Sequence, residues 1–215
     1  MQTLATLVKY DGTSLYYRVD APPDYLVAKQ HFNEATIILQ DGRSITAAQR
    51  RKVFAILNDI SKWNYDDVDT NHWHLKWQHI AEKGGDFFSL ANCTVTQARL
   101  YISFLLDFCL ANDIKMSEPI LNRTDDINAA LYSALMRKKC IVCGKYGELH
   151  HAEDRVGAGR NRNVIVHMGM RVMCLCREHH NEAHNIGQAS FNYKYHIYGI
   201  AADENICEVY KLNFN

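Results

Sequence analysis

The stretch from Cys140 to His184 decides the fold, because it carries three groups of cysteines and histidines. They read Cys140-Ile-Val-Cys143, Leu149-His150-His151 and Cys176-Arg-Glu-His179-His180-Asn-Glu-Ala-His184. Two such side chains separated by two residues lie close enough to bind the same ion. The spacing therefore predicts one site that closes around an ion, with a second set of histidines beside it.

A structural zinc knuckle is the interpretation that the first set favours. Its two pairs are Cys140 with Cys143 and Cys176 with His179. Four cysteine and histidine ligands are typical of structural zinc, which keeps no open position for chemistry. Buried or chance cysteines are the alternative. Cys174 is an alternative ligand, but we expect Cys174 and Cys207 to pack in the core.

The remaining histidines predict a site for a catalytic metal ion. His180 and His184 are four residues apart on an expected helix, so both rings lie on one face and can bind one ion. His150 and His151 end an expected strand, where neighbouring side chains point to opposite faces, so that one can bind metal and the other can face substrate. A histidine with a pKa of about 6.5 is able to take a proton from water. This arrangement suits hydrolysis of a phosphodiester with one metal ion.

The net charge is zero, but the charges are unevenly distributed. Residues 1–136 carry 13 Lys/Arg and 16 Asp/Glu, whereas residues 137–177 carry nine basic and three acidic residues. A local positive field suits a polyanion such as DNA, and a solvated surface is the alternative. The glycine-rich loop between the two expected strands offers three arginines for contact with phosphate, namely Arg155, Arg160 and Arg162.

Length and composition restrict the class of protein. A chain of 215 residues holds one large domain or two small ones. It has no apolar run long enough to span a membrane and no secretory pattern, so we expect a cytoplasmic protein without a membrane partner. Its seven cysteines are an odd number and suit zinc ligands better than disulfides.

The first part of the chain predicts a mixture of strands and helices. Alternation of apolar and polar residues predicts strands at Thr3–Lys9, Leu15–Val19 and Ala35–Leu39, with a helix at Asp24–Phe32. Capping boxes at Thr46-x-x-Gln49 and Thr94-x-x-Gln97 predict two further helix starts. A helix at Ile127–Lys138 is expected to lead into the cysteine motif. We place the domain boundary near 118–138 and divide the chain into domains 1–125 and 126–215.

Residues 140–184 resemble the HNH, or ββα-metal, endonuclease superfamily, and most closely its zinc-knuckle branch in phages and prophages. The likeness runs through Leu149-His-His, Gly157-Ala-Gly-Arg-Asn-Arg-Asn and Leu175-Cys-Arg-Glu-His-His to His184. The resemblance implies that His151 is the general base and that His150, His180 and His184 bind Mg²⁺ or Mn²⁺. It also implies that the structural zinc ligands are Cys140, Cys143, Cys176 and His179.

The asparagine that gives the superfamily its name has no counterpart at the expected place. It usually opens the second strand, where this chain has Arg171, so we include Arg171 in the catalytic set. Asn161, Asn163 and His167 are alternatives for the residue that orients the base.

Residues from about 30 to 118 are similar to the phage Orf/NinB recombination-mediator family. The similarity lies in Asp41-Gly-Arg-Ser-Ile-Thr-Ala-Ala-Gln-Arg-Arg-Lys and in Asn112-Asp-Ile-Lys115-Met. It implies binding of single-stranded DNA, a homodimer and contact with single-strand-binding protein. Candidate DNA contacts are Arg50, Arg51 and Lys52 with nearby Trp63. The alternative is that the three basic residues are simply solvated. We expect the tryptophans to be core residues. We expect His72, His74 and His79 to be ordinary surface or core histidines.

Together these patterns predict an α+β protein encoded by a phage or prophage, in which an Orf/NinB-like domain precedes a small ββα-metal (HNH) domain with a zinc knuckle. We expect it to act in the bacterial host cell as a metal-dependent endonuclease in recombination, on branched or single-strand-containing DNA. One alternative is a non-catalytic single-stranded-DNA-binding mediator. Another is a zinc-ribbon protein that acts only through protein partners, which predicts no affinity for DNA at low salt.

Overall fold

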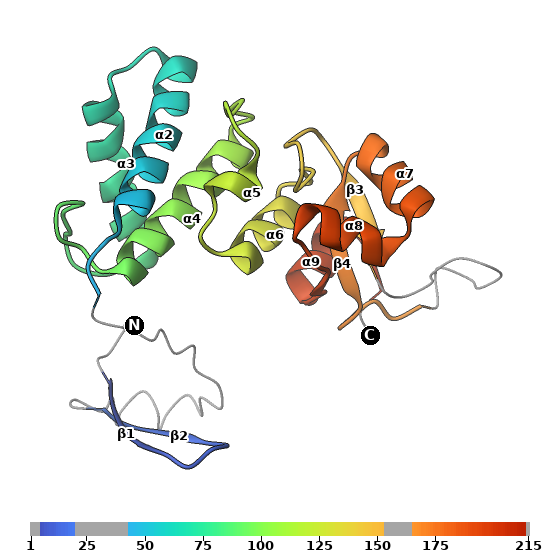
Figure 1. Cartoon of the computed structure of the whole chain (residues 1–215), viewed down its shortest axis with the longest axis horizontal. Coiled ribbons are helices and arrows are strands. Elements are labelled where there is room, and N and C mark those ends of the chain that lie inside the picture. The colour runs from blue at the N-terminus through green and yellow to red at the C-terminus, as the bar shows by residue number, and fades with distance from the viewer. Residues whose placement is uncertain (1–4, 20–42, 153–164, 214–215) are drawn as a thin grey trace.

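The computed structural model describes residues 5–19, 43–152 and 165–213, which form helices and two small sheets (Figure 1). The strands are β1 (Ala5–Tyr10) and β2 (Leu15–Val19) in one sheet, and β3 (Glu148–His151), β4 (Arg171–Leu175) and β5 (Ile200–Ala201) in the other. The helices are α2 (Ala47–Asn64), α3 (Val68–Lys83), α4 (Val95–Ala111), α5 (Ile120–Arg123), α6 (Ile127–Met136), α7 (Arg177–Ile186), α8 (Gln188–Tyr195) and α9 (Glu204–Tyr210). This mixture agrees with the expected α+β class. Among the described residues no helix is both long and apolar enough to cross a membrane.

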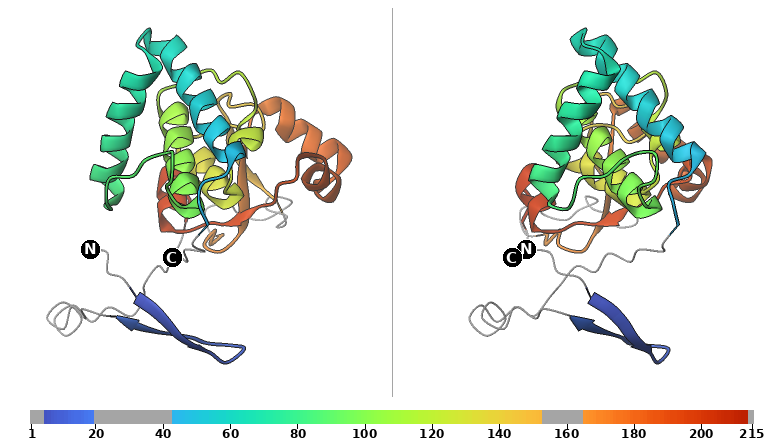
Figure 2. Two further views of the ribbon diagram at one scale, coloured as in Figure 1. Left: turned by 60° about the vertical axis from the view of Figure 1, so that its left-hand side comes forward. Right: turned by 90° about the vertical axis from the view of Figure 1, so that its left-hand side faces the viewer.

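Strands β1 and β2 form an antiparallel hairpin. The Asp11 carboxylate closes its turn by accepting hydrogen bonds from the backbone N–H groups of Thr13 (3.1 Å) and Ser14 (2.8 Å). The second strand has the predicted bounds, and the first ends at Tyr10, one residue later than predicted; its predicted start at Thr3 lies outside the described residues. Figures 1 and 2 show the hairpin apart from the helices. The predicted helix at Asp24–Phe32 and strand at Ala35–Leu39 lie outside the described residues.

Both predicted capping boxes are present. In each, the threonine hydroxyl accepts a hydrogen bond from the backbone N–H of the glutamine, and the glutamine side chain accepts one from the threonine N–H. Thr46 thus caps α2 and Thr94 caps α4. The two helix starts lie together because the Gln49 side chain also donates to the Val95 carbonyl, at 3.1 Å.

Helix α3 fills the aromatic-rich segment for which the sequence predicted no helix. Asp67 caps it by accepting a hydrogen bond from the Thr70 N–H. Its buried face consists of Asn71, Leu75, Lys76 and His79. The tryptophans lie elsewhere and are about half exposed: Trp63 is 46%, Trp73 52% and Trp77 45% exposed. The expectation that they are core residues is therefore wrong: Trp63 belongs to α2 but not to its buried face, and Trp73 and Trp77 lie outside the buried face of α3.

The histidines of this region behave as ordinary residues, as expected. His79 is buried against Tyr101 and Phe104, with ring centroids 5.5 Å and 5.1 Å away. His72 is partly buried and His74 is exposed. Within the described ranges they belong to no cluster of metal ligands.

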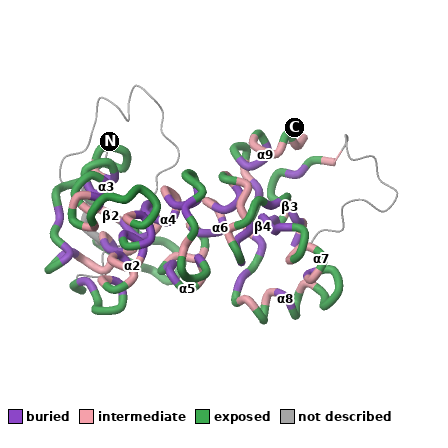
Figure 3. Tube along the Cα trace, turned by 90° about the horizontal axis from the view of Figure 1, so that it is seen from above, coloured by how far each residue is buried: buried purple, intermediate pink, exposed green. Residues whose placement is uncertain are grey.

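The hydrophobic core continues from the helices into the second sheet. Ile102 of α4 and Met173 of β4 belong to one cluster of buried side chains, and α6 contacts both α4 and β4. Figure 3 shows buried positions following α4, α6 and β4 through the middle of the molecule. The domain limits at residues 1–125 and 126–215 stay a prediction, and α6 begins just after the proposed boundary.

The second sheet has helices on both faces, and this arrangement separates the two histidines that end β3. The antiparallel register pairs His150 with Met173 and His151 with Val172. Met173 packs in the same cluster as Phe191 of α8, whereas Val172 packs with Ile206 of α9. Since successive side chains in a strand point to opposite faces, His150 faces α7 and α8 and His151 faces the other side.

Candidate metal sites

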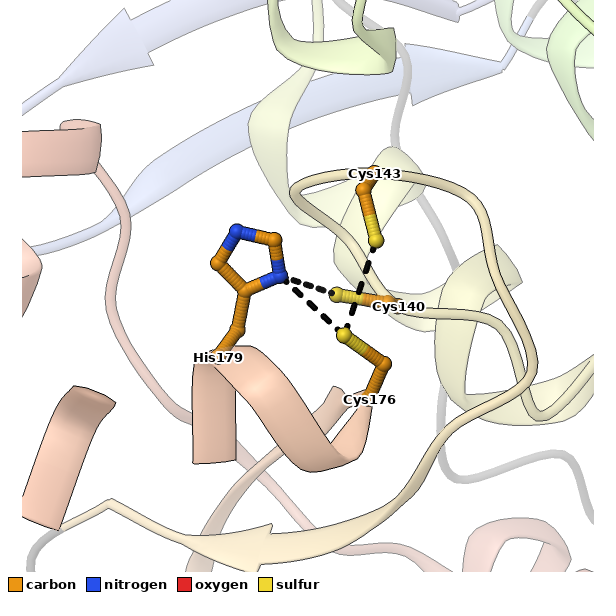
Figure 4. Close-up of side chains that lie close together, drawn as sticks. All are labelled: Cys140, Cys143, Cys176 and His179. Atoms are coloured by element: carbon orange, nitrogen blue, oxygen red, sulfur yellow. Dashed lines mark hydrogen bonds between the residues drawn. The ribbon is translucent and has the colours of Figure 1, made fainter. Parts of the chain in front are cut away.

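The four predicted knuckle ligands lie together (Figure 4). Cys140 and Cys143 lie in the turn between α6 and β3, Cys176 is the N-cap of α7, and His179 is in the first turn of that helix. The Sγ atoms of Cys143 and Cys176 are 3.6 Å apart. The Nδ1 atom of His179 lies 3.5 Å from Cys140 Sγ and 3.2 Å from Cys176 Sγ.

These distances and donors fit a zinc ion. Sulfur and nitrogen ligands at the corners of a tetrahedron around zinc are roughly 3.5–3.8 Å apart, given the usual bond lengths. The cysteines are all free thiols, and burial raises the pKa of both Cys140 and Cys143. A bound cation favours the thiolate forms that burial disfavours. Cys174 and Cys207 are buried in the second hydrophobic cluster, as expected for core residues.

A tight turn brings the first two cysteines together. The Gly144 N–H donates to the Cys140 carbonyl at 2.8 Å, and the Cys140 N–H donates to the Lys145 carbonyl at 2.7 Å. Gly144 has a φ of 71°, in the left-handed region that favours glycine. The knuckle therefore depends on local backbone geometry as well as on its ligands.

His150, His180 and His184 form the second cluster. One candidate ligand atom from each lies within 4.8 Å of the others. The ring centroid of His150 is 4.6 Å from that of His180 and 5.2 Å from that of His184. Burial lowers the pKa of His150 and of His180, which favours the neutral forms that can bind a cation. The structure thus brings together the three residues predicted to bind the catalytic ion.

His151 lies beside His167 on the other face of β3. Their ring centroids are 5.4 Å apart, and His167 is buried. Backbone hydrogen bonds hold His167 in place, since its N–H donates to the Asn213 carbonyl at 2.8 Å and its carbonyl accepts from the Met170 N–H at 3.0 Å. His167 is therefore a candidate for orienting the base whose ring lies beside the ring of His151.

Arg171 opens β4 as predicted, but its side chain is exposed. Its guanidinium donates to the Gly199 carbonyl at 3.5 Å, and its backbone carbonyl accepts from the Ala152 N–H at 2.8 Å. A catalytic role for Arg171 stays a prediction. The other candidates in the long loop lie outside the described residues: Asn161, Asn163, Arg155, Arg160 and Arg162.

Two of the three basic residues on α2 make contacts within the fold. Arg50 donates to the carbonyls of Leu90 (2.9 Å) and Ala91 (3.2 Å). Lys52 donates to the Thr124 carbonyl at 2.7 Å and forms an ion pair with Asp125. Arg51 is exposed. These contacts give Arg50 and Lys52 a structural role, and DNA contact by the trio stays a prediction.

Sequence reasoning missed two residues beside the histidine cluster. Gln188 Oε1 lies 2.7 Å from His150 Nε2, and Glu148 Oε1 lies 3.4 Å from His180 Nδ1. Glu148 precedes His150 by two residues, so the alternation of a strand would have placed both on one face. Gln188 is 38 residues from His150, and no local pattern connects them.

A family model described as "Putative HNHc nuclease" matches residues 18–213. The chain belongs to this family. Membership supports the HNH nuclease class, with DNA as substrate and metal ions as cofactors. The match to the HNHc nucleases spans the helices α2–α6 as well as both metal sites. No curated protein and no solved structure matches the chain.

Proposed function

We propose that this HNHc nuclease hydrolyses phosphodiester bonds of DNA with a divalent ion held by His150, His180 and His184. One observation carries the proposal: the candidate ligand atoms of these residues gather within 4.8 Å of one another. Three protein ligands leave positions open for substrate, as in catalytic metal sites. Mg²⁺ or Mn²⁺ is the proposed ion.

In this mechanism His151 is the general base. His150, His180 and His184 would hold the divalent ion, which would supply positive charge to offset the negative charge that develops during phosphodiester hydrolysis. The neutral ring of His151 accepts a proton from the water that attacks phosphorus. The bond between phosphorus and the 3′ oxygen breaks, and the 3′ oxygen takes a proton from solvent water, which leaves a 5′-phosphate and a 3′-hydroxyl. His167, in ring contact with His151, orients the base, and Arg171 remains a candidate for contact with substrate.

The zinc knuckle would hold the two catalytic elements in position. Its ligands Cys176 and His179 lie at the start of α7, and His179 directly precedes His180. Its other ligands, Cys140 and Cys143, lie in the turn that leads into β3. A structural Zn²⁺ at this place would tie α7 to β3 and would keep the histidines of these elements in their relative positions.

Branched or single-strand-containing DNA is the proposed substrate class. The exposed rings of Trp73, Trp77 and Phe87 contact one another, with centroids 5.6 Å to 6.1 Å apart. Aromatic side chains of this kind stack on unpaired bases. The resemblance of residues 30–118 to recombination mediators supports a homodimer that works with single-strand-binding protein in phage recombination, inside the bacterial host.

The test is DNA cleavage by the wild type, His184→Ala and His196→Asn. Labelled single-stranded, duplex, flapped and four-way-junction DNA is offered with Mg²⁺ or Mn²⁺. Loss of a metal ligand removes several kcal/mol of transition-state stabilisation, so we expect His184→Ala to cleave at least about 100-fold more slowly. His196 is exposed at the end of α8 in left-handed backbone that asparagine tolerates, so His196→Asn should cleave normally. A wild type that binds DNA but cuts none of it would support the mediator instead.

A further inference from the structure

We propose that Gln188 sets the tautomer of His150 and thereby selects Nδ1 of His150 as the nitrogen that binds the divalent ion. The inference rests on the proposed metal site and adds a positioning residue to it. It also gives a role to the chain after α7, for which the sequence suggested no function.

A glycine turn carries Gln188 to the histidine cluster. Gly187 ends α7 with a φ of 82°, and Gln188 is the first residue of α8. This backbone conformation is rare for residues with a side chain. The reversal places Gln188 Oε1 2.7 Å from His150 Nε2, within hydrogen-bonding distance. His150 is only 3% exposed, so water does not readily replace this partner.

A second hydrogen bond fixes which way the Gln188 amide points. Its Nε2 group donates to the Asn192 Oδ1 atom, one turn later in α8, at 2.7 Å. Since an amide nitrogen donates and an amide oxygen accepts, the Gln188 oxygen is left facing His150. A ring nitrogen that meets an acceptor carries the proton. Neutral His150 is therefore protonated on Nε2, and its lone pair lies on Nδ1.

This arrangement matches the way proteins prepare histidine ligands. A ligating histidine usually donates its second ring N–H to an oxygen of the protein, and loss of that partner typically lowers metal affinity about 10–100-fold. Gln188 supplies such an acceptor from the start of α8.

The tautomer is measured directly in the full-length protein, with zinc in the knuckle and before Mg²⁺ or Mn²⁺ is added. Two-bond ¹⁵N–¹H spectra of histidine-labelled protein report which ring nitrogen carries the proton, and the His150 signals are assigned by their loss in His150→Phe. We expect protonation on Nε2 in the wild type. Gln188→Glu keeps an acceptor and should keep this tautomer. Gln188→Lys presents only donors and should move the proton to Nδ1.

Calorimetric titration with Mn²⁺ gives the second readout. We expect Gln188→Lys to bind Mn²⁺ about 10–100-fold more weakly than the wild type. Gln188→Glu should bind Mn²⁺ as the wild type does. Gln78→Lys is the matched control, because Gln78 is exposed on α3. Circular dichroism and zinc content establish that each variant is folded.

Two results would overturn the inference. One is protonation of wild-type His150 on Nδ1, which needs no variant to fold. The other is Mn²⁺ affinity in folded Gln188→Lys equal to that of the wild type. If His184→Ala also binds Mn²⁺ normally, the proposed metal site itself is wrong. If only His184→Ala weakens binding, the metal site stands and the role of Gln188 fails.

Discussion

At the residue scale, burial separates histidines that look alike in the sequence. His72 contacts the rings of Phe54 and Tyr101, both with centroids 5.9 Å away. Burial lowers the pKa of His72 to about 4 and lowers that of His79 as well. The nearby Lys76 lowers the pKa of His72 further, and Asp69 opposes this effect. These rings stay neutral in the folded chain at a pH where histidines of the unfolded chain are protonated.

We predict that the free energy of unfolding falls as the pH decreases from 6.5 to about 4. In this range the unfolded chain binds a proton on His72 and the folded chain does not, so acid favours unfolding. The contribution of neutral His72 is complete above the unfolded pKa and is lost as the pH falls to the folded one. Urea unfolding of the wild type and His72→Phe at several pH values tests this. The variant, which retains the metal-site histidines, should lose less stability on acidification, and identical profiles would contradict the prediction.

At the scale of the elements, the turn from α6 to β3 and the start of α7 depend on each other through the zinc ligands. We predict that Cys176→Ser loses zinc and melts at a lower temperature, because it removes a ligand at the N-cap of α7. Cys174→Ala, a buried cysteine outside the ligand set, should retain one zinc per chain. Metal analysis and thermal circular dichroism measure both effects. Zinc loss in Cys174→Ala, or its retention in Cys176→Ser, would show that the ligand set is wrong.

Some features of these elements could be predicted from the sequence alone, and others could not. Capping boxes and the i, i+4 spacing of His180 and His184 are local properties, so they predicted the starts of α2 and α4 and the shared face of α7. Helix α3 was missed, although Asp67 before Val68 is a usable capping signal. Which face of α3 packs depends on α2 and α4, so the exposure of its tryptophans was not predictable. The contact of Gln188 with His150 likewise depends on how the chain turns after α7.

At the scale of the whole molecule, the continuous core links the helical part to the histidine sites. Helix α6 packs against α4 on one side and β4 on the other, and β4 pairs with the strand that carries His150 and His151. The family match covers the same two parts. We therefore infer that the helices support the nuclease site as well as any DNA contacts of their own.

The most direct test is the initial rate of cleavage by the wild type and His151→Ala with Mg²⁺ or Mn²⁺, with DNA binding measured at the same salt concentration. We expect the variant to bind DNA as the wild type does and to cleave it about 10²–10⁴-fold more slowly, as removal of a general base predicts. Cleavage by His151→Ala at the wild-type rate would contradict the assignment of the base. Absence of cleavage by the wild type with either ion would contradict the nuclease itself.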